Sequence, residues 1–297
     1  MNQLLPNMSA PSPSTQSATF SERQREALLK LLVDEDAAVY QTIRQKILSC
    51  GQEAAPWLRA HVLSSDPVLR RRAQEIIQHL ARQQTDSEFL TFCLKQGENF
   101  DAEEACWLLA RTQYPDINVA AYQALLDSYA GELLERINYS VPQEQTLGTM
   151  NQFLFSELGF TGNEECYYDP ENSYLNRVID RRKGNPISLC LLYLFLARRL
   201  HLPVTGIGMP GHFLCRYQST TAELFIDPFY RGKFLSKADC IGYLRKADHG
   251  YHEGDLDPAA PRRILLRVCS NLHRIYADLA LTEEVSRLQR YIVALSR

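Results

Sequence analysis

Two residues in the second half of the chain, His212 and Asp227, have the types and spacing of a catalytic pair. They lie in two runs, VTGIGMPGHFLCRY and ELFIDPFYRGKFL, which alternate apolar and polar residues around a short loop. Such alternation predicts two strands of a hairpin. In a register symmetric about Ser219 and Thr220, His212 faces Asp227 with Cβ atoms about 5 Å apart. The carboxylate would then orient the imidazole as a base for a nucleophile.

The same register pairs residues of matching character along the whole hairpin. A shift by one residue would spoil every pair at once, because it turns each side chain to the other face. The pairs that this register predicts are Arg216 with Glu223, Leu214 with Phe225, Phe213 with Ile226, and Cys215 with Leu224.

A nucleophile would have to come from the helix that the sequence predicts before the hairpin. Asn185 followed by Pro186 is typical of a helix start. The run from Leu189 to Ala197 is apolar on every side, so we expect this helix to be surrounded by protein. Its first turn offers backbone N–H groups that could stabilise an anion or a thiolate.

Two side chains on this helix are candidate nucleophiles, Cys190 and Ser188. Cys190 lies about five residues into the helix, past the turn where the helix dipole stabilises a thiolate best. We therefore expect it to be a buried thiol that packs as a small hydrophobic residue. Ser188 lies in the first turn and could form hydrogen bonds, but it needs a base within reach to act as a nucleophile.

The segment before this helix supplies two basic candidates, Arg181 and Arg182. Asp169 and Pro170 are placed to start a helix, and Gly184 is placed to end it. The two arginines could hold a carboxylate or phosphate near Asn185, although basic residues are favoured at helix C-termini in any case.

A third group of polar residues, in the run HGYHEGDLD, has the types of metal ligands. His249, His252 and Glu253 supply imidazole and carboxylate groups, but Gly250 and Gly254 indicate a loop. The H-x-x-H spacing lacks the helical context that would orient both imidazoles toward one ion. A metal at this loop stays an open alternative, and we expect no cofactor elsewhere.

The segments that must position these residues are mostly helical. Apolar residues recur at helical spacing over residues 21–98, and two stretches, from Asp36 and from Asp66, align at an offset of 30 residues like a weak HEAT-type repeat. A second helical stretch runs from Glu103 to Ile137 with a break at Tyr114-Pro115-Asp116. Residues 262–297 predict a helical hairpin with Thr282 as the cap between its helices, similar to one tetratricopeptide unit that must dock on the core.

Composition narrows the classes of partner and the compartment. The 297 residues carry 32 basic and 35 acidic side chains, so no general attraction for nucleic acid or anionic lipid exists. Eight cysteines without a C-x-x-C pair favour buried thiols in a reducing compartment. The first 20 residues are rich in Ser, Pro and Thr and predict a disordered tail rather than a signal peptide. We therefore expect a cytoplasmic protein with a protein or peptide partner, without nucleic acid or membrane binding.

The order of these motifs resembles that of the transglutaminase-like superfamily, with a helix, an L-x-L-P break, a strand starting G-H-F and a strand ending I-D-P-F. More narrowly, NSYLNRVIDRRKGNPISL, MPGHFLCRY and IDPFYRGKFL resemble the SirB-type branch. The resemblance implies a papain-like α+β core with His212 and Asp227 at the histidine and aspartate positions. Counting back from Leu202-Pro203 places the superfamily cysteine near Pro186 to Ser188, where this chain has no thiol.

The sequence thus predicts a predominantly helical α+β protein of four segments. These are a disordered tail (1–20), a HEAT-like helical region (21–98), a transglutaminase-like core (99–258) and a tetratricopeptide-like hairpin (259–297). Two functions remain open. The preferred one is a non-catalytic interaction module, a pseudoenzyme with a degenerate core. The alternative is a cysteine-type acyl-transfer enzyme that uses Cys190, His212 and Asp227.

Overall fold

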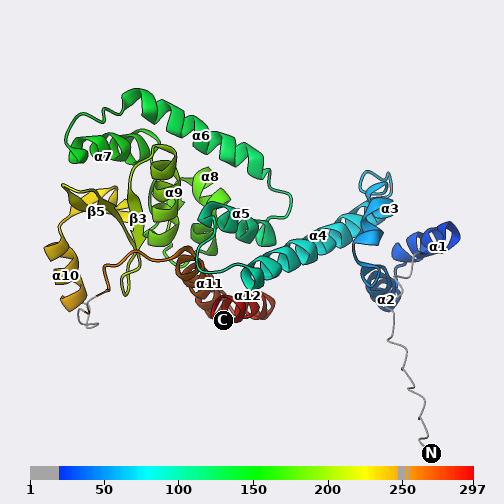
Figure 1. Ribbon diagram of the computed structural model, residues 1–297. Coiled ribbons are helices and arrows are strands. Elements are labelled where there is room, and N and C mark those ends of the chain that lie inside the picture. The colour runs from blue at the N-terminus through cyan, green and yellow to red at the C-terminus, as the bar shows by residue number, and fades with distance from the viewer. Residues whose placement is uncertain (1–19, 247–251, 253) are drawn as a thin grey trace, which may run out of the picture. The chain divides into compact units, whose positions relative to one another are not determined.

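The computed structural model, drawn in Figure 1, describes residues 20–246, 252 and 254–297. The chain divides into two compact units between Ala81 and Arg82, inside one long helix, α4 (Pro67–Lys95). This division precedes the predicted boundary after residue 98, because the second part of α4 buries Phe89 and Cys93 in the core of the second unit. The predicted tail falls almost entirely on residues 1–19, which lie outside the described residues.

The first unit is helical, as the apolar spacing predicts. The two aspartates of the repeat cap helices in this unit: Asp36 accepts from the amide of Ala38 and Asp66 from that of Val68, each at 2.8 Å. Its own core is small. Its elements are α1 (Glu22–Leu32), α2 (Ala37–Leu48), the 3₁₀ turn η1 (Gly51–Ala54), α3 (Ala55–Arg59) and the first part of α4.

The second unit contains a helical layer around one central helix, α9 (Pro186–Arg199). Eleven of its 14 residues are buried, as its continuous apolar run predicts. One core joins α9 to the sheet and to the C-terminal helices. The other helical elements are α5 (Ala102–Gln113), α6 (Val119–Arg136), α7 (Gln143–Asn151), the π-helix η2 (Gln152–Glu157), the 3₁₀ turns η3 (Pro170–Ser173) and η4 (Pro228–Tyr230), α8 (Leu175–Arg181), α10 (Lys237–Lys246), α11 (Pro261–Asp278) and α12 (Thr282–Leu295).

Three predicted helix boundaries are wrong. The segment from Asp169 begins as the 3₁₀ turn η3. The helix α8 ends at Arg181, followed by Arg182 with a left-handed backbone at φ 56°, rather than at Gly184. Gly184 instead forms part of a short strand. Thr282 is the first residue of α12, and the capping position belongs to Leu281, which makes no side-chain cap.

The sheet has more strands than the two predicted runs. A turn with Gly211 at φ 75° divides the first run, and the η4 turn divides the second. The result is an antiparallel sheet in the order β3-β4-β5-β6, beside a separate parallel pair, β1-β2. The strands are β1 (Thr161–Gly162), β2 (Lys183–Gly184), β3 (Val204–Ile207), β4 (Leu214–Gln218), β5 (Glu223–Asp227) and β6 (Lys233–Leu235).

The hairpin register differs from the predicted one by two residues. Cys215 pairs with Ile226 rather than with Leu224, because the turn is closed by the amide of Ser219 donating to the carbonyl of Ala222. A shift by two residues keeps every side chain on its predicted face. The predicted pair of Arg216 and Glu223 accordingly survives as a diagonal contact at 3.6 Å.

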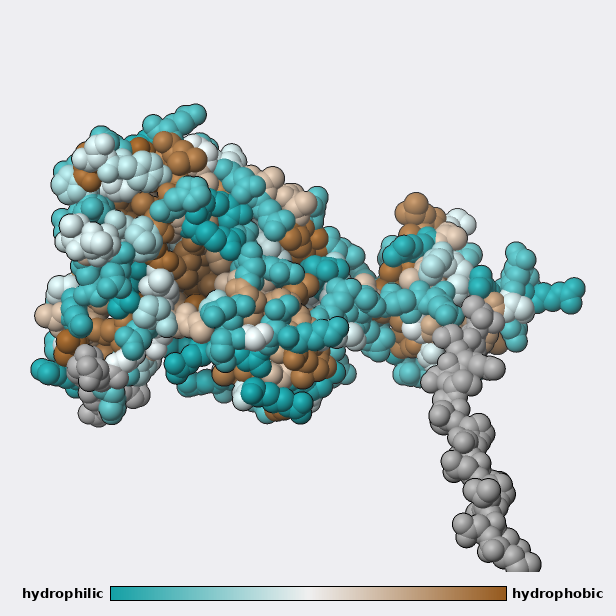
Figure 2. All heavy atoms as spheres, in the orientation of Figure 1, coloured by the Kyte–Doolittle hydropathy of each residue, from teal (hydrophilic) through white to brown (hydrophobic). Residues whose placement is uncertain are grey.

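The surface of the molecule is mixed in character. Figure 2 shows hydrophilic side chains over most of the visible face, with apolar residues in patches, the deepest in a hollow of the second unit. Within the described part of the chain, no helix combines the length and apolarity needed to cross a membrane.

Candidate functional site

His212 and Asp227 are in contact. The Nε2 atom of His212 lies 2.7 Å from Oδ2 of Asp227, and the two side chains are only 11% and 5% exposed. The other carboxylate oxygen accepts the backbone N–H groups of Phe229 and Tyr230, which caps η4. Asp227 is therefore fixed by the turn that follows its strand, and it can hold the imidazole in one orientation.

Aromatic rings surround the imidazole. The rings of Phe229, Tyr230 and Tyr243 lie with centroids 5.9–6.2 Å from that of His212. The backbone of His212 is held as well, because Nη2 of Arg267 donates to its carbonyl oxygen at 2.9 Å. The histidine is thus positioned by four elements, β5, η4, α10 and α11.

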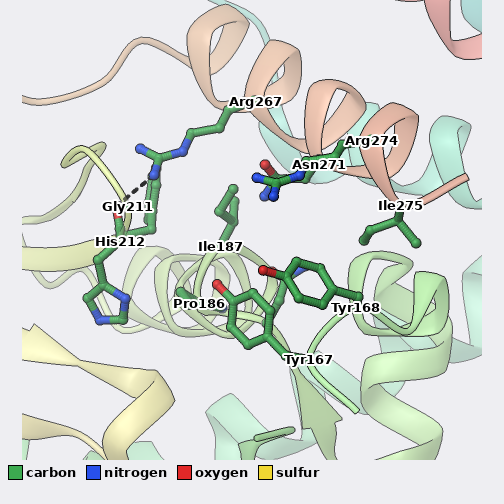
Figure 3. Close-up of a pocket in the computed structure, with 12 residues that line it drawn as sticks. Tyr167, Tyr168, Pro186, Ile187, Gly211, His212, Arg267, Asn271, Arg274 and Ile275 are labelled. Atoms are coloured by element: carbon green, nitrogen blue, oxygen red, sulfur yellow. Dashed lines mark hydrogen bonds between the residues drawn. The ribbon is translucent and has the colours of Figure 1, made fainter. Parts of the chain in front are cut away.

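His212 lines a cleft of about 420 Å³ between the start of α9 and one face of α11. Figure 3 shows Pro186 and Ile187 below, Arg267 and Arg274 above, and Tyr167 with Tyr168 in front. The cleft is therefore located at the first turn of α9, which is itself buried, and α11 supplies its opposite wall.

The first turn of α9 is closed by a reciprocal cap. The side chain of Asn185 accepts the amide of Ser188 at 2.9 Å, and Oγ of Ser188 accepts the amide of Asn185 at 3.0 Å. Oγ of Ser188 also donates to the carbonyl of Asn172 at 2.6 Å. The residue Ser188 is only 3% exposed, and its hydroxyl is occupied by the hydrogen bonds of this cap. It is therefore not available to act as a nucleophile.

Cys190 is sealed in the core. It is 0% exposed, and its thiol donates to the carbonyl of Phe213 at 3.4 Å. Burial, with the neighbouring thiol of Cys215, raises the pKa of Cys190 well above its ordinary value. The thiolate needed for acyl transfer is therefore strongly disfavoured at this position.

Arg181 and Arg182 point to structural partners. Arg181 forms ion pairs with Asp169 and Glu171, each at 2.7 Å. Arg182 donates to the backbone carbonyl of Leu158 at 2.5 Å. Neither arginine lines the cleft beside Asn185.

The loop with metal-type ligands is described only in part. His249 and Glu253 lie outside the described residues. The exposed imidazole of His252 lies 3.7 Å from Asp255. Over residues 20–246, 252 and 254–297, no group of three or more His, Cys, Asp or Glu side chains is arranged to hold a metal ion.

Sequence reasoning missed the residues of the cleft that come from α11. Arg267, Asn271 and Arg274 follow one another at spacings of four and three residues, which places them on one helix face. That polar stripe is visible in the sequence beside the apolar stripe that packs on the core. The sequence predicts that the hairpin docks on the core, but it gives no signal for the element that the polar stripe would face.

Comparison with family models decides the family. A model described as the transglutaminase-like superfamily matches residues 120–270, which include α9, the whole sheet and the first half of α11. The chain belongs to the transglutaminase-like superfamily. The α+β, predominantly helical fold expected from the motif order is thereby confirmed.

Curated relatives add a narrower family. A UPF0162 protein of Xylella fastidiosa strain 9a5c is 39% identical over 177 residues, 58% of this chain and 63% of the relative. A UPF0162 protein of Pseudomonas aeruginosa is 31% identical over 191 residues, 62% of this chain and 68% of the relative. The chain is thus a member of the UPF0162 family. It spans 63% of the length of the Xylella protein.

A shorter similarity reaches outside bacteria. The human F-box only protein 21 is 41% identical over 106 residues, which are 33% of this chain and 17% of that protein. No solved structure matches the chain.

Proposed function

We propose that this protein is a non-catalytic interaction module of the SirB-type branch, which uses its transglutaminase-like cleft to bind a peptide segment of a partner protein. The observation that carries the proposal is the first turn of α9. The superfamily position for the nucleophile falls on Pro186 to Ser188, where Pro186 and Ile187 have no reactive group and Ser188 is used by the cap.

The shape of the cleft supports a binding role. About 420 Å³ accommodates a few residues of an extended peptide, and apolar Ile187 and Ile275 lie among polar groups that could orient it. In this proposal the His212–Asp227 pair stabilises a wall of the cleft by joining the start of β4 to the end of β5.

Binding can be tested with peptides selected from a random phage-displayed library on the intact protein. We expect selected peptides, synthesised with a fluorescent label, to bind the protein and to lose at least about tenfold in affinity when Tyr168→Ala removes an exposed ring of the cleft. Tyr139→Ala is the control, since Tyr139 lies outside the cleft and is 55% exposed against 57% for Tyr168; because it also loses a hydrogen bond to the carbonyl of Leu200, the folding of both variants is checked by circular dichroism. Equal loss in both variants, or no selected peptide, contradicts the proposal.

The cysteine-type alternative can be tested on the same preparations. Acyl transfer through Cys190 requires that incorporation of a labelled amine into a glutamine peptide be abolished by Cys190→Ala and by His212→Ala. We expect wild type and Cys190→Ala to give the same background. An activity present in wild type and lost in both variants would establish the enzyme and refute the non-catalytic proposal.

A further inference from the structure

The polar side chains that line the cleft can all donate hydrogen bonds, and several of them have no hydrogen-bond acceptor among the described residues. Arg267, Asn271 and Arg274 project from α11, and Tyr167 and Tyr168 face them, as Figure 3 shows. Among the residues that the structure describes, no Asp or Glu lines the cleft. Among the described residues, the side chains of Asn271, Arg274 and the two tyrosines make no hydrogen bond or ion pair.

Arg267 is a half-buried cation that has no counter-ion within the described part of the chain. Its guanidinium donates once, to the carbonyl of His212, and lies 5.7 Å over the ring of Phe213. Burial lowers the pKa of Arg267, and the groups that oppose this effect are tyrosines and a cysteine rather than carboxylates. A desolvated cation is costly unless an anion is paired with it.

Other buried arginines of the same unit have such partners or full sets of acceptors. Arg262, one turn earlier on α11, donates to the carbonyls of Leu295, Ala294, Cys93 and Gln96. Arg199 on α9 pairs with Glu103 and Asp127. Arg267 differs from both, since most of its N–H donors have no protein acceptor within the described part of the chain.

We propose that the cleft recognises a carboxylate of its peptide ligand, which Arg267 and Arg274 pair with. The proposal rests on the peptide-binding function above and names the group that is bound. A guanidinium fork matches the two oxygens of a carboxylate, and the amide of Asn271 supplies a neutral donor beside it.

The opposite wall favours the same charge. Ile187 lies in the first turn of α9, where Pro186 has no N–H and the amide of Ser188 is taken by Asn185. Because the start of α9 lines the cleft, the positive end of its helix dipole faces a ligand that α11 binds. A peptide offers carboxylates from two sources, its C-terminus and the side chains of Asp and Glu.

The test uses labelled hexapeptide libraries in three forms with wild-type protein. The first has a free C-terminal carboxylate and omits Asp and Glu, the second has a C-terminal amide and includes Asp and Glu, and the third has a C-terminal amide and omits both. We expect the first or the second form to bind at least about tenfold more tightly than the third. The form that binds identifies the source of the carboxylate.

Variants of the two arginines then test whether Arg267 and Arg274 bind the carboxylate of the peptide. We expect Arg267→Gln or Arg274→Gln to bring the tighter form within about twofold of the third, and Arg267→Lys to restore part of the difference. Arg263→Gln is the matched control, because Arg263 is an exposed arginine of α11 outside the cleft. Should Arg267→Gln fail to fold, the wild-type comparison and Arg274→Gln decide the question.

The two proposals fail differently. Equal binding of all three forms, still lost in Tyr168→Ala, would overturn carboxylate recognition and leave peptide binding in place. Preference for a carboxylate form that persists in both glutamine variants would also overturn it, because the preference would then arise elsewhere. Absence of binding by every form would overturn peptide binding and the carboxylate site together.

Discussion

Individual side chains decide what this cleft can do, and Cys190 is the clearest case. Cys190 was the candidate nucleophile because it is the cysteine on the helix that precedes the hairpin of His212 and Asp227 in the sequence. Complete burial and a pKa raised well above the ordinary value make it an inert one. Six of the eight free cysteines are buried, so most thiols of this chain serve packing.

Alkylation distinguishes the buried thiol from an accessible one. We expect iodoacetamide to label Cys166, which is exposed, and to leave Cys190 unlabelled in the folded protein, because the reagent attacks thiolates that it can reach. Both should be labelled in urea, as measured by peptide mass spectrometry. Native labelling of Cys190 at the rate of Cys166 would contradict its assignment to the core.

Asp227 is expected to matter for stability through its hydrogen bonds. Asp227→Ala leaves His212 and the amides of Phe229 and Tyr230 without their acceptor, so we expect a loss of about 2–4 kcal/mol in the free energy of unfolding. Asp227→Asn keeps an acceptor for the amides and should lose less. Urea unfolding followed at Trp107, in a Trp57→Phe background, reports on the second unit. Equal losses in the two variants would count against this explanation.

At the scale of elements, the sequence specifies the helices better than the strands. The break between α5 and α6, the buried run of α9 and the Asn185 cap all follow from spacing and residue type. The strand boundaries depend on turns closed by backbone contacts, such as the one at Ser219 and Ala222, which no residue pattern specified. The predicted contact of His212 with Asp227 is nevertheless present, although His212 lies two residues before β4 and is not directly opposite Asp227, because a shift by two residues keeps Asp227 on its predicted face.

Gly184 shows how tightly the start of α9 is packed. A Cβ at this residue would lie 2.7 Å from Oγ of Ser188 and 3.0 Å from Cγ of Leu189, so we expect Gly184→Ala to cost about 1–3 kcal/mol. Gly131→Ala, in the interior of α6 with open space around it, should instead stabilise by about 1 kcal/mol. The same urea experiment measures both. A neutral Gly184→Ala would show that the cap can shift to accept a methyl group.

At the scale of the whole chain, long-range contacts determine what the sequence could not. The segment after residue 258 was expected to dock on the core, and its residues do belong to the same core as α5 and α9, but the sequence does not indicate which elements it contacts. Tyr276 of α11, for example, shares a hydrogen bond with Tyr174 at 3.0 Å. Contacts between residues 102 positions apart leave no local signal, and for that reason the wall made by α11 was not predicted.

Replacing Arg262 tests whether the C-terminal helices α11 and α12 contribute to the stability of the second unit. Arg262 joins α11 to the carbonyls that end α12 and to those near the end of α4, all within the second unit. Arg262→Ala leaves several buried carbonyls unpaired, so we expect a loss of about 2–4 kcal/mol, measured at Trp107 as above. Arg263→Ala, on the exposed side of the same helix, should stay within about 0.5 kcal/mol of wild type.

Because α11 both packs in the core and forms one wall of the cleft, the cleft cannot form before α11 has been synthesised. During synthesis, α9 and the four-stranded sheet leave the ribosome before α11 does. A chain that has been synthesised only as far as β6 contains the imidazole and its carboxylate, but it lacks the helix that forms the opposite wall and carries Arg267 and Arg274. The proposed carboxylate site can therefore form only after α11 has been synthesised and has packed on the core.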